Sequence, residues 1–446
     1  MDFLPHTDDD VQSMLEAIGV GSIEDLFEPV PRDVLLDRPL DVPPELSELE
    51  LIDHLSELAA SSRGAADLVC FAGGGAYDHY VPAAVRALAS RAEFTTSYTP
   101  YQPELSQGVL QAIYEFQSLV CELYGLGVAN ASLYDGGAAL AEAVNLAVRI
   151  TGRGRVVVGG TVHPHYLQVL DTYTSGLGIQ VDAVPRAEDG TVEWSAIDAA
   201  DAAAVVVAAP NFFGLLEDVT GAAEVAHDAG AIAVSVTDPT AMGIFRPPGD
   251  AGIDVAVGEG TALGNALSYG GPSVGLFATR LDLVRQVPGR IAGATVDADG
   301  RRAFVLTLQA REQHIRRAKA TSNVCTNQTL MAIATAVHLS WLGPGGLRRL
   351  GELCLRRTAV AARRLEEVPG CSVRFGGTKF KEFVLETPRD GAELAAALAR
   401  RGFLVGPGLG RWYPDLANCL LVAVTERRTE GDIEGFAEAV EKELAG

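Results

Sequence analysis

Strand-like apolar runs alternate with helix-like segments through the middle of the chain. Residues 202–209 form the strongest apolar run, which lacks polar alternation and therefore predicts a strand covered on both faces. Apolar runs also predict strands at 155–160, 179–185, 231–239 and 254–260, and helical spacing predicts helices at 110–125, 136–150, 163–178 and 221–230. Such alternation favours a mostly parallel sheet with right-handed crossovers, so the sequence predicts an α/β domain.

The first 60 residues differ from this pattern. Thr7 can cap a helix that begins at Asp8, and the acidic residues 8–10 favour the positive end of the helix dipole. The segment SIEDLF at 22–27 has a capping-box pattern and predicts a second short helix. Because these apolar residues have little core of their own, we expect residues 1–60 to form a helical arm. The arm would lie on another surface, either its own domain or a partner.

From about residue 300 the pattern changes again. Residues 301–369 are predicted to be largely helical, with a break at the Leu-Gly-Pro-Gly of 342–345. Short strands and helices follow, and they predict a compact α+β unit. The predicted organisation is an arm at 1–60, a large α/β domain at 61–310, and linking helices with a small C-terminal α+β domain at 311–446.

Composition and charge narrow the function classes. With 35 basic and 58 acidic residues the net charge is −23, which excludes a protein that binds nucleic acid through clustered cations. Hydrophobic residues make up 48 %, which excludes global disorder. The six cysteines are scattered and no signal-peptide pattern is present, so we expect reduced thiols, a cytoplasmic location and no membrane span. No residues have zinc-ligand spacing, so no metal site is predicted.

Glycines and polar residues follow the ends of several predicted strands. Gly136 and Gly137 open a helix, where backbone N–H groups and the helix dipole can cradle a phosphate. Asp238 ends one apolar strand, and His163 follows another. Each residue also has a simpler interpretation: a glycine loop that opens a helix, a helix cap or turn, and a structural histidine.

Together with the order of a large and then a small domain, these residues resemble the fold-type I pyridoxal-phosphate enzymes. In that class the glycine cradle holds the cofactor phosphate, the aspartate bonds the pyridine nitrogen and a side chain at the position of His163 covers the ring. The class also needs a Schiff-base lysine shortly after the aspartate, but residues 239–278 contain none. The chain has only four lysines, at 319, 379, 381 and 442, and none of them is predicted to enter the pocket. We therefore expect a vestigial pocket without covalently bound pyridoxal phosphate.

Six blocks of sequence carry a more specific pattern. They are residues 5–20, 71–85, 96–117, 129–143, 254–278 and 317–330. In this order they resemble the glycine decarboxylase of the glycine cleavage system, the P-protein, in its split form, and they match the subunit called alpha or subunit 1. The TPYQPE and ATSNVCTNQ motifs within them are highly specific together. The last 110 or so residues resemble only the generic small domain of the fold class.

The resemblance implies a heteromeric enzyme. The alpha chain pairs with a beta subunit, subunit 2, and the heterodimer usually doubles to a heterotetramer. The beta subunit carries the lysine and binds pyridoxal phosphate. Glycine forms an aldimine, loses its carboxylate as carbon dioxide, and its aminomethyl group passes to the lipoyl arm of the H-protein. The pyridinium ring is the electron sink.

The resemblance also implies that the alpha chain closes the site across the subunit interface. The loop TSYTPYQPE offers Tyr98, Tyr101, Gln102 and Glu104, which could position the substrate and exclude water. Further candidates are Tyr77, Asp78, His79 and Tyr80, which follow three glycines at 73–75, and Ser322, Asn323 and Thr326. Interface packing is the alternative for the tyrosines, and capping or turn formation is the alternative for the last three.

Two other functions stay open at this point. An independent pyridoxal-phosphate enzyme would need Lys319 to enter the site. A non-catalytic scaffold or regulatory paralogue would bind a catalytic partner without contributing a residue to its active site.

Overall fold

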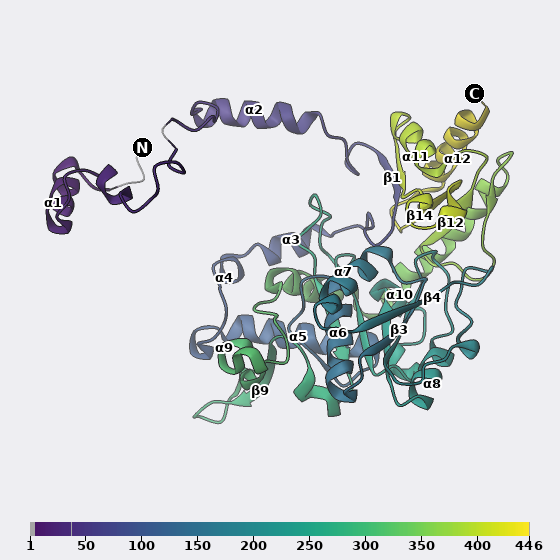
Figure 1. The fold of residues 1–446 in the computed structure, drawn as a ribbon. Helices are drawn as coiled ribbons and strands as arrows, with labels where there is room; N and C mark the ends of the chain where they lie inside the picture. Colours follow the sequence, from purple (N-terminus) through teal and green to yellow (C-terminus); the bar gives the residue numbers. More distant parts are fainter. Residues whose placement is uncertain (1–4, 37, 446) are drawn as a thin grey trace. The chain divides into compact units, whose positions relative to one another are not determined.

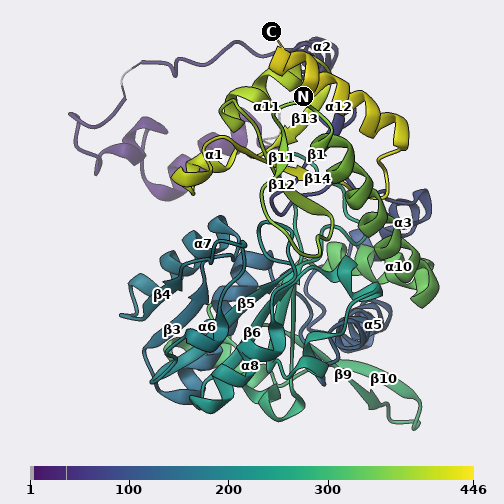
Figure 2. The same ribbon diagram turned by 90° about the vertical axis from the view of Figure 1, so that its right-hand side faces the viewer.

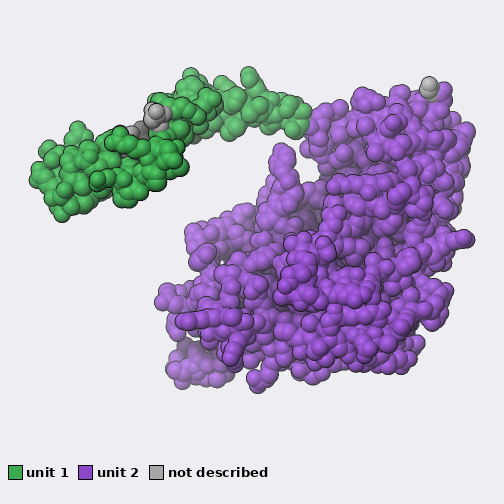
Figure 3. All heavy atoms as spheres, viewed as in Figure 1, with its two compact units in different colours: residues 1–62 green, residues 63–446 purple. Residues whose placement is uncertain are grey.

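A computed structural model describes residues 5–36 and 38–445 of the chain. The chain forms two compact units, which span 1–62 and 63–446 and are coloured separately in Figure 3. The sequence analysis expected a domain boundary near residue 310, but the residues on both sides of that position belong to the second unit.

The first unit consists of short capped helices joined by irregular chain. Helix α1 (Asp8–Ile18) begins where predicted, because the Thr7 hydroxyl accepts a hydrogen bond from the Asp10 N–H and the Asp10 carboxylate accepts one from the Thr7 N–H. The predicted second helix is a 3-10 turn at Glu24–Phe27, and helix α2 (Glu48–Ala60) follows it.

The apolar side chains of the first unit are almost all exposed. Among its described residues Leu15 alone is buried. The large apolar side chains exposed on α1 and α2 are Met14, Ile18, Leu49, Leu51, Ile52, Leu55 and Leu58. Short amphipathic helices depend on packing of their apolar face, and within this unit that face finds almost no core.

A seven-stranded sheet forms the centre of the second unit (Figure 1). Its strand order is β2-β8-β7-β6-β5-β3-β4. Strands β3 to β7 pair in parallel, whereas β8 runs antiparallel to β7 and β2. The strands are β2 (Val128–Ala129), β3 (Arg155–Gly159), β4 (Gln180–Val184), β5 (Ala202–Ala209), β6 (Ile232–Thr237), β7 (Val255–Glu259) and β8 (Gly275–Thr279). The predicted mostly parallel α/β sheet is confirmed.

Helices cover both faces of this sheet (Figure 2). They are α5 (Gln107–Tyr124), α6 (Gly136–Thr151), α7 (Pro164–Ser175), α8 (Val219–Asp228) and α10 (Thr329–Glu366). Helices α6 and α7 pack on one face, and α5, α8 and α10 pack on the other. Successive β5 residues divide between the two cores: Val206 packs on the α6 side, and Val205 and Val207 on the opposite side. Burial on both faces explains why this strand has no polar alternation.

Between β8 and α10 the chain differs from the prediction. Strands β9 (Ile291–Val296) and β10 (Arg302–Thr307) form an antiparallel hairpin. The prediction that 301–369 is largely helical is therefore wrong for β10. Phe304 and Leu306 are buried while the residues around them are less so. The sequence does not show this alternation, because residues 303–306 are all apolar, and periodicity alone does not distinguish a short apolar run in a strand from one in a helix.

Helix α10 packs against α5 and α3 (Ala83–Ala89). It is broken at Gly343, where φ is +61°, as predicted from the Leu-Gly-Pro-Gly motif. By length and composition α10 could cross a membrane, and 44 % of the relevant window is buried inside the protein. The second unit also contains two one-turn α-helices, α4 (Ala92–Thr95) and α9 (Gln313–Arg316).

A smaller antiparallel sheet of order β11-β12-β14 lies in the C-terminal part of the second unit. The elements are β11 (Ser372–Val373), β12 (Glu382–Glu386), α11 (Gly391–Arg400), β13 (Phe403–Gly406), β14 (Cys419–Ala423) and α12 (Glu430–Ala445). Strand β13 pairs in parallel with β1 (Val69–Ala72). The chain that follows β1 therefore runs beside the small sheet, although the sequence analysis assigned it to the large domain.

Candidate functional site

A cavity of about 80 Å³ lies where β5, β6 and β7 end at their carboxyl side. Parallel sheets commonly bind ligands at this edge. Of the predicted pocket residues, His163 and Asp238 line the cavity. Glu259 also lines it and accepts a hydrogen bond of 3.1 Å from the Gly136 N–H. The structure therefore brings together the predicted phosphate cradle, with Gly137 next along α6, and the other two predicted residues.

Lys381 enters this cavity from the C-terminal sheet. It precedes β12, its ammonium forms an ion pair with the Asp238 carboxylate, and 1 % of its side chain is exposed. Its Nζ lies 3.6 Å from the Tyr77 ring centroid and 3.3 Å from the Thr240 hydroxyl oxygen. The prediction that no lysine enters the pocket is wrong, because chain segments remote in sequence meet where β12 approaches the parallel sheet. Lys319, by contrast, is exposed and does not line the cavity.

Asp238 makes two kinds of interaction. Its Oδ1 accepts a hydrogen bond of 2.9 Å from the Thr240 N–H, so it caps the turn at Pro239–Gly243. The simpler interpretation as a cap is therefore correct, and the ion pair is additional. Burial acts to raise the pKa of Asp238, but the Lys381 ammonium outweighs it and holds that pKa below its usual range. The carboxylate is ionised, and its charge is neutralised within the chain.

Glu259 occupies the anion-binding end of α6. Its Oε2 accepts from the Gly136 N–H, and its Oε1 accepts from the N–H groups of Thr261 and Val274 at 2.9 and 3.2 Å. Burial raises the pKa of Glu259, and these donors act in the opposite direction. Asp135 caps the same helix through an N–H of the first turn at 2.7 Å. Two carboxylates therefore use the positive end of α6.

His163 is held by the backbone on both ring nitrogens. Its Nε2 lies 2.6 Å from the Gly74 carbonyl oxygen, and its Nδ1 accepts from the His165 N–H at 3.0 Å. Since Nδ1 accepts, the proton lies on Nε2 and the ring is neutral, in line with a pKa that burial lowers. The ring stacks on Tyr166 with centroids 5.0 Å apart. His163 is thus the cap of α7 and also a wall of the cavity.

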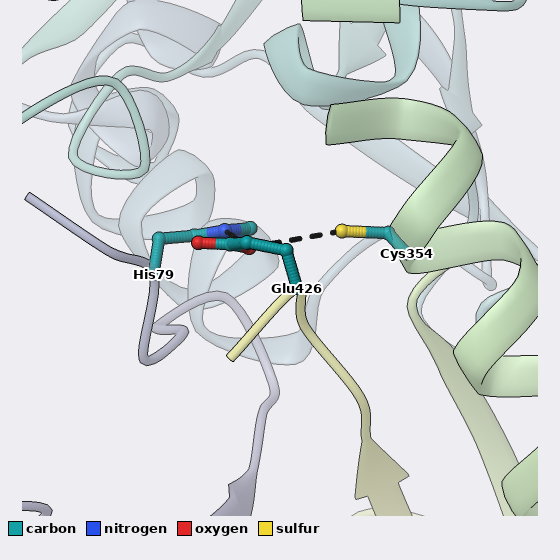
Figure 4. Close-up of side chains that lie close together, drawn as sticks. All are labelled: His79, Cys354 and Glu426. Carbon is teal, nitrogen blue, oxygen red and sulfur yellow. Dashed lines mark hydrogen bonds and ion pairs between the residues drawn. The ribbon is translucent and has the colours of Figure 1, made fainter. Parts of the chain in front are cut away.

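Next to Lys381, the side chains of His79, Glu426 and Cys354 form a compact cluster (Figure 4). Glu426 Oε2 lies 2.7 Å from His79 Nδ1 and 3.9 Å from Cys354 Sγ, and Lys381 Nζ lies 3.3 Å from His79 Nε2. Zinc needs a deprotonated thiolate and an imidazole lone pair. Burial raises the pKa of Cys354 to about 12 and an ammonium faces Nε2, so these donors do not fit zinc. They fit a hydrogen-bond relay from Glu426 through His79 to Lys381 and Asp238.

The three glycines after β1 let the chain approach the C-terminal sheet closely. A Cβ on Gly73 would lie 2.7 Å from the Ala423 Cβ, and Gly74 has a φ of +71°. The Gly74 N–H and the Tyr77 hydroxyl both donate to the Glu382 carboxylate, at 2.6 and 2.7 Å. Burial raises the pKa of Glu382 to about 7. The other residues predicted in this segment are Asp78, paired with Arg427 and Arg428, His79, beside Lys381, and Tyr80, which is exposed.

The residues predicted to act across a subunit interface lie on an open groove formed by residues 93–109. Tyr98, Tyr101 and Gln102 line the groove, and Glu104 is exposed on the same loop. The side chain of Tyr98 is 92 % exposed. Such aromatic exposure on one loop is typical of a surface that another chain covers.

Arg290 connects this loop to the ATSNVCTNQ motif. Its guanidinium lies 5.4 Å from the Tyr101 ring centroid, and it donates to the Thr326 hydroxyl at 3.2 Å. Sequence analysis missed Arg290, because a single arginine before an apolar strand forms no motif. Ser322 accepts a hydrogen bond within its own turn and Asn323 is exposed, so for Ser322 the turn interpretation is correct. The two most specific motifs therefore meet through one buried cation.

Known proteins resemble the chain over its whole length. A family model described as "Glycine cleavage system P-protein" matches residues 1–440. "Probable glycine dehydrogenase (decarboxylating) subunit 1" of Geotalea daltonii is 47 % identical over 447 residues, which cover 100 % of both chains. The protein of the same name from Carboxydothermus hydrogenoformans is 48 % identical over 443 residues, or 99 % of each chain. These matches confirm the resemblance stated from the sequence motifs.

Solved structures agree with this result. The crystal structure of glycine decarboxylase (P-protein) of the glycine cleavage system, in inhibitor-bound form, has a TM-score of 0.91 and 45 % identity, and it covers 99 % of this chain and 100 % of that one. A NifS-like protein has a TM-score of 0.62 at 13 % identity, covers 85 % of this chain and 99 % of that one, and shows the fold alone. The predicted fold class, resembling the fold-type I pyridoxal-phosphate enzymes, is confirmed.

Proposed function

The chain belongs to the glycine cleavage system P-protein family, and on this premise we propose that it acts as subunit 1 of a heteromeric glycine decarboxylase. In this proposal a beta subunit holds pyridoxal phosphate on its own lysine, glycine is the substrate, and the lipoylated H-protein accepts the aminomethyl group. Support comes from relatives that carry the name subunit 1 over the full length of the chain.

One observation carries the proposal: the residues of this chain do not fit a bound pyridoxal phosphate. The loop after β7 presents Thr261 and Ala262 to the cavity, and no lysine. Lys381, whose amine reaches the cavity, is the one lysine among the described residues that line it, and it is paired with Asp238. The cavity measures about 80 Å³, whereas small-molecule pockets usually measure roughly 300–1,000 Å³. A chain of this family that does not fit the cofactor needs a partner that holds it.

The chain's own contribution to catalysis is to complete the partner's site. Pyridoxal phosphate bound by the partner supplies the electron sink for decarboxylation. Tyr98, Tyr101, Gln102 and Glu104 lie on an exposed loop. Once a second chain covers them, the tyrosines and Gln102 can donate hydrogen bonds, the Glu104 carboxylate can accept them, and together they can orient glycine and exclude water. Because Arg290 contacts Tyr101 from the protein interior, this loop is positioned before the partner binds.

Glycine–bicarbonate exchange in the presence of H-protein tests the proposal. The co-expressed complex is expected to catalyse exchange, and this chain alone is expected to catalyse none. The proposal is wrong if this chain alone exchanges bicarbonate and borohydride fixes a vitamin B6 group onto one of its own lysines.

Conservative variants separate a catalytic contribution from a non-catalytic scaffold. In the assembled complex Tyr98→Phe or Tyr101→Phe should lower kcat about tenfold, the effect of one hydrogen bond worth about 1.4 kcal/mol. Tyr114→Phe on α5, away from the loop, is the matched control and should leave kcat unchanged. Normal turnover by both loop variants in an intact complex would instead show a scaffold.

A further inference from the structure

We propose that Lys381 and Glu259 occupy, inside this chain, the positions that the ring nitrogen and the phosphate of pyridoxal phosphate take in this fold, and that they thereby exclude the cofactor. The chain would thus carry a built-in positive group and a built-in negative group at the two ends of its vestigial pocket. The proposal concerns this chain's own cavity, so it can fail while the chain still works as subunit 1.

The cationic end of the pocket is complete without a ligand. Asp238 follows β6, where the fold class places the aspartate that bonds a protonated ring nitrogen. Here the Lys381 ammonium forms that ion pair, with the Thr240 hydroxyl oxygen 3.3 Å from Nζ and the Tyr77 ring centroid 3.6 Å away. A ring nitrogen could reach Asp238 only by displacing an ammonium that is 1 % exposed.

The position of Lys381 is fixed by more than its ion pair. Its backbone has a φ of +64°, a left-handed conformation that persists in an L-residue only when the surroundings impose it. Its carbonyl oxygen accepts a hydrogen bond of 2.7 Å from the Val424 N–H. The side-chain ammonium of Lys381 donates to His79 Nε2. Glu426 orients the His79 ring through Nδ1 (Figure 4). Lys381 is therefore a built-in cation, held by both the backbone and the relay.

The anionic end is complete as well. The Glu259 carboxylate accepts from three backbone N–H groups, those of Gly136, Thr261 and Val274, and from the Thr261 hydroxyl. One of these N–H groups belongs to the start of the 16-residue helix α6, where the cofactor class places its phosphate. A phosphate there would lose these donors to Glu259 and would be repelled by its charge and by that of Asp135.

Steric room agrees with the charges. The cavity of about 80 Å³ is much smaller than the roughly 300–1,000 Å³ of usual small-molecule pockets. His163 stacks on Tyr166 and bonds the Gly74 carbonyl, so the ring that could cover a cofactor packs against the chain itself. The charges, the hydrogen bonds and the volume of the cavity thus all oppose binding of pyridoxal phosphate.

Binding of 4′-deoxypyridoxine 5′-phosphate to the full-length chain tests the proposal. This probe keeps the ring nitrogen and the phosphate but lacks the aldehyde, so exposed lysines cannot trap it. Equilibrium dialysis of the wild-type chain should show no saturable site. The double variant Lys381→Met with Glu259→Gln should bind one probe per chain, at least about tenfold more tightly than the wild type. Lys379→Met, which removes a neighbouring lysine outside the cavity, should behave as wild type.

Two results would overturn the proposal: a wild-type chain that binds one probe tightly, or a double variant that is folded by circular dichroism and binds no better than wild type.

A second measurement needs no variant. After treatment of the wild-type chain with pyridoxal phosphate and borohydride, mass spectrometry should find the pyridoxyl group on exposed Lys319 and none on Lys381. Labelled Lys381 would contradict the proposal. Neither assay uses exchange activity, so failure here is distinct from failure of the proposed function.

Discussion

Replacing Lys381 by methionine removes the charge that neutralises Asp238 and keeps an unbranched apolar chain in its place. The two side chains are 1 % and 15 % exposed, so the remaining carboxylate would be a nearly buried, unpaired charge. Removing one partner of a buried ion pair typically costs about 3–5 kcal/mol of unfolding free energy. The matched variant Lys379→Met alters a lysine outside the cavity and should change stability by no more than about 0.5 kcal/mol.

The size of this loss should depend on pH. In the wild type the pKa of Asp238 is lowered, so the ion pair stabilises the fold above the unfolded-state pKa near about 4, and this stabilisation is lost as pH falls through the folded-state value. In Lys381→Met the Lys381 ammonium no longer opposes burial, which is the largest influence on Asp238, so the pKa of Asp238 rises and the folded variant takes up a proton as pH falls. The difference between the two proteins is therefore largest near about pH 8 and smaller near about pH 5.

Urea unfolding of the full-length chain at both pH values, followed by circular dichroism, measures the difference. Adding Asp238→Asn to Lys381→Met should recover most of the lost stability, because no unpaired charge then remains. A loss below about 1 kcal/mol at the higher pH, or an equal loss at both, would refute the reasoning.

Three further outcomes follow from the same structure. Glu382→Gln should stabilise the protein near about pH 8 and change little near about pH 5 in thermal unfolding. The reason is that the pKa of Glu382 is about 7 in the folded protein and 4.5 in the unfolded chain, so the stabilisation from its protonated form is lost as pH rises through about 7. An equal effect of the substitution at both pH values would contradict this reasoning. Arg290→Met should free Tyr101 and lower glycine–bicarbonate exchange by the complex about tenfold, without changing the mass of the complex. Arg290→Lys should not restore activity, because lysine cannot make the bidentate contacts of arginine. Full activity of Arg290→Met would mean that Tyr101 needs no support from Arg290. Leu55→Glu in α2 should weaken association with the beta subunit about tenfold in sedimentation experiments, whereas Glu57→Gln should not; unchanged association would show that the arm's apolar face does not bind the partner.

Local patterns predicted most of the elements of the fold. The run at 202–209 became β5 because burial on both faces removes polar alternation, and the Thr7 cap fixed the start of α1. The hairpin β9–β10 was missed because β10 was assigned to the helical region that was predicted to begin at residue 301, and no element was predicted for β9. Long apolar runs and helix caps were therefore reliable signals, whereas a short apolar run such as that of β10 did not distinguish strand from helix.

The candidate site was predictable only where strand ends determine it. Asp238, His163 and the glycines of α6 come together because a parallel sheet places the carboxyl ends of its strands at one edge. Lys381 could not be placed, because its position depends on how β12 and the segment after β1 dock against that edge. The rarity of lysine in this chain was the one sequence signal that singled it out.

The hydrogen-bonding demands of the fold itself account for the charges in the cavity. The first N–H groups of any helix need acceptors, and here the protein itself supplies them. Glu259 satisfies the N–H of Gly136 and two further N–H groups. Asp238, whose side chain is 15 % exposed, then requires a cation of its own. Lys381 supplies that cation, and the His79–Glu426 pair satisfies the ammonium in turn. No ligand is required at any step of this chain of donors and acceptors, as the proposed exclusion of the cofactor demands.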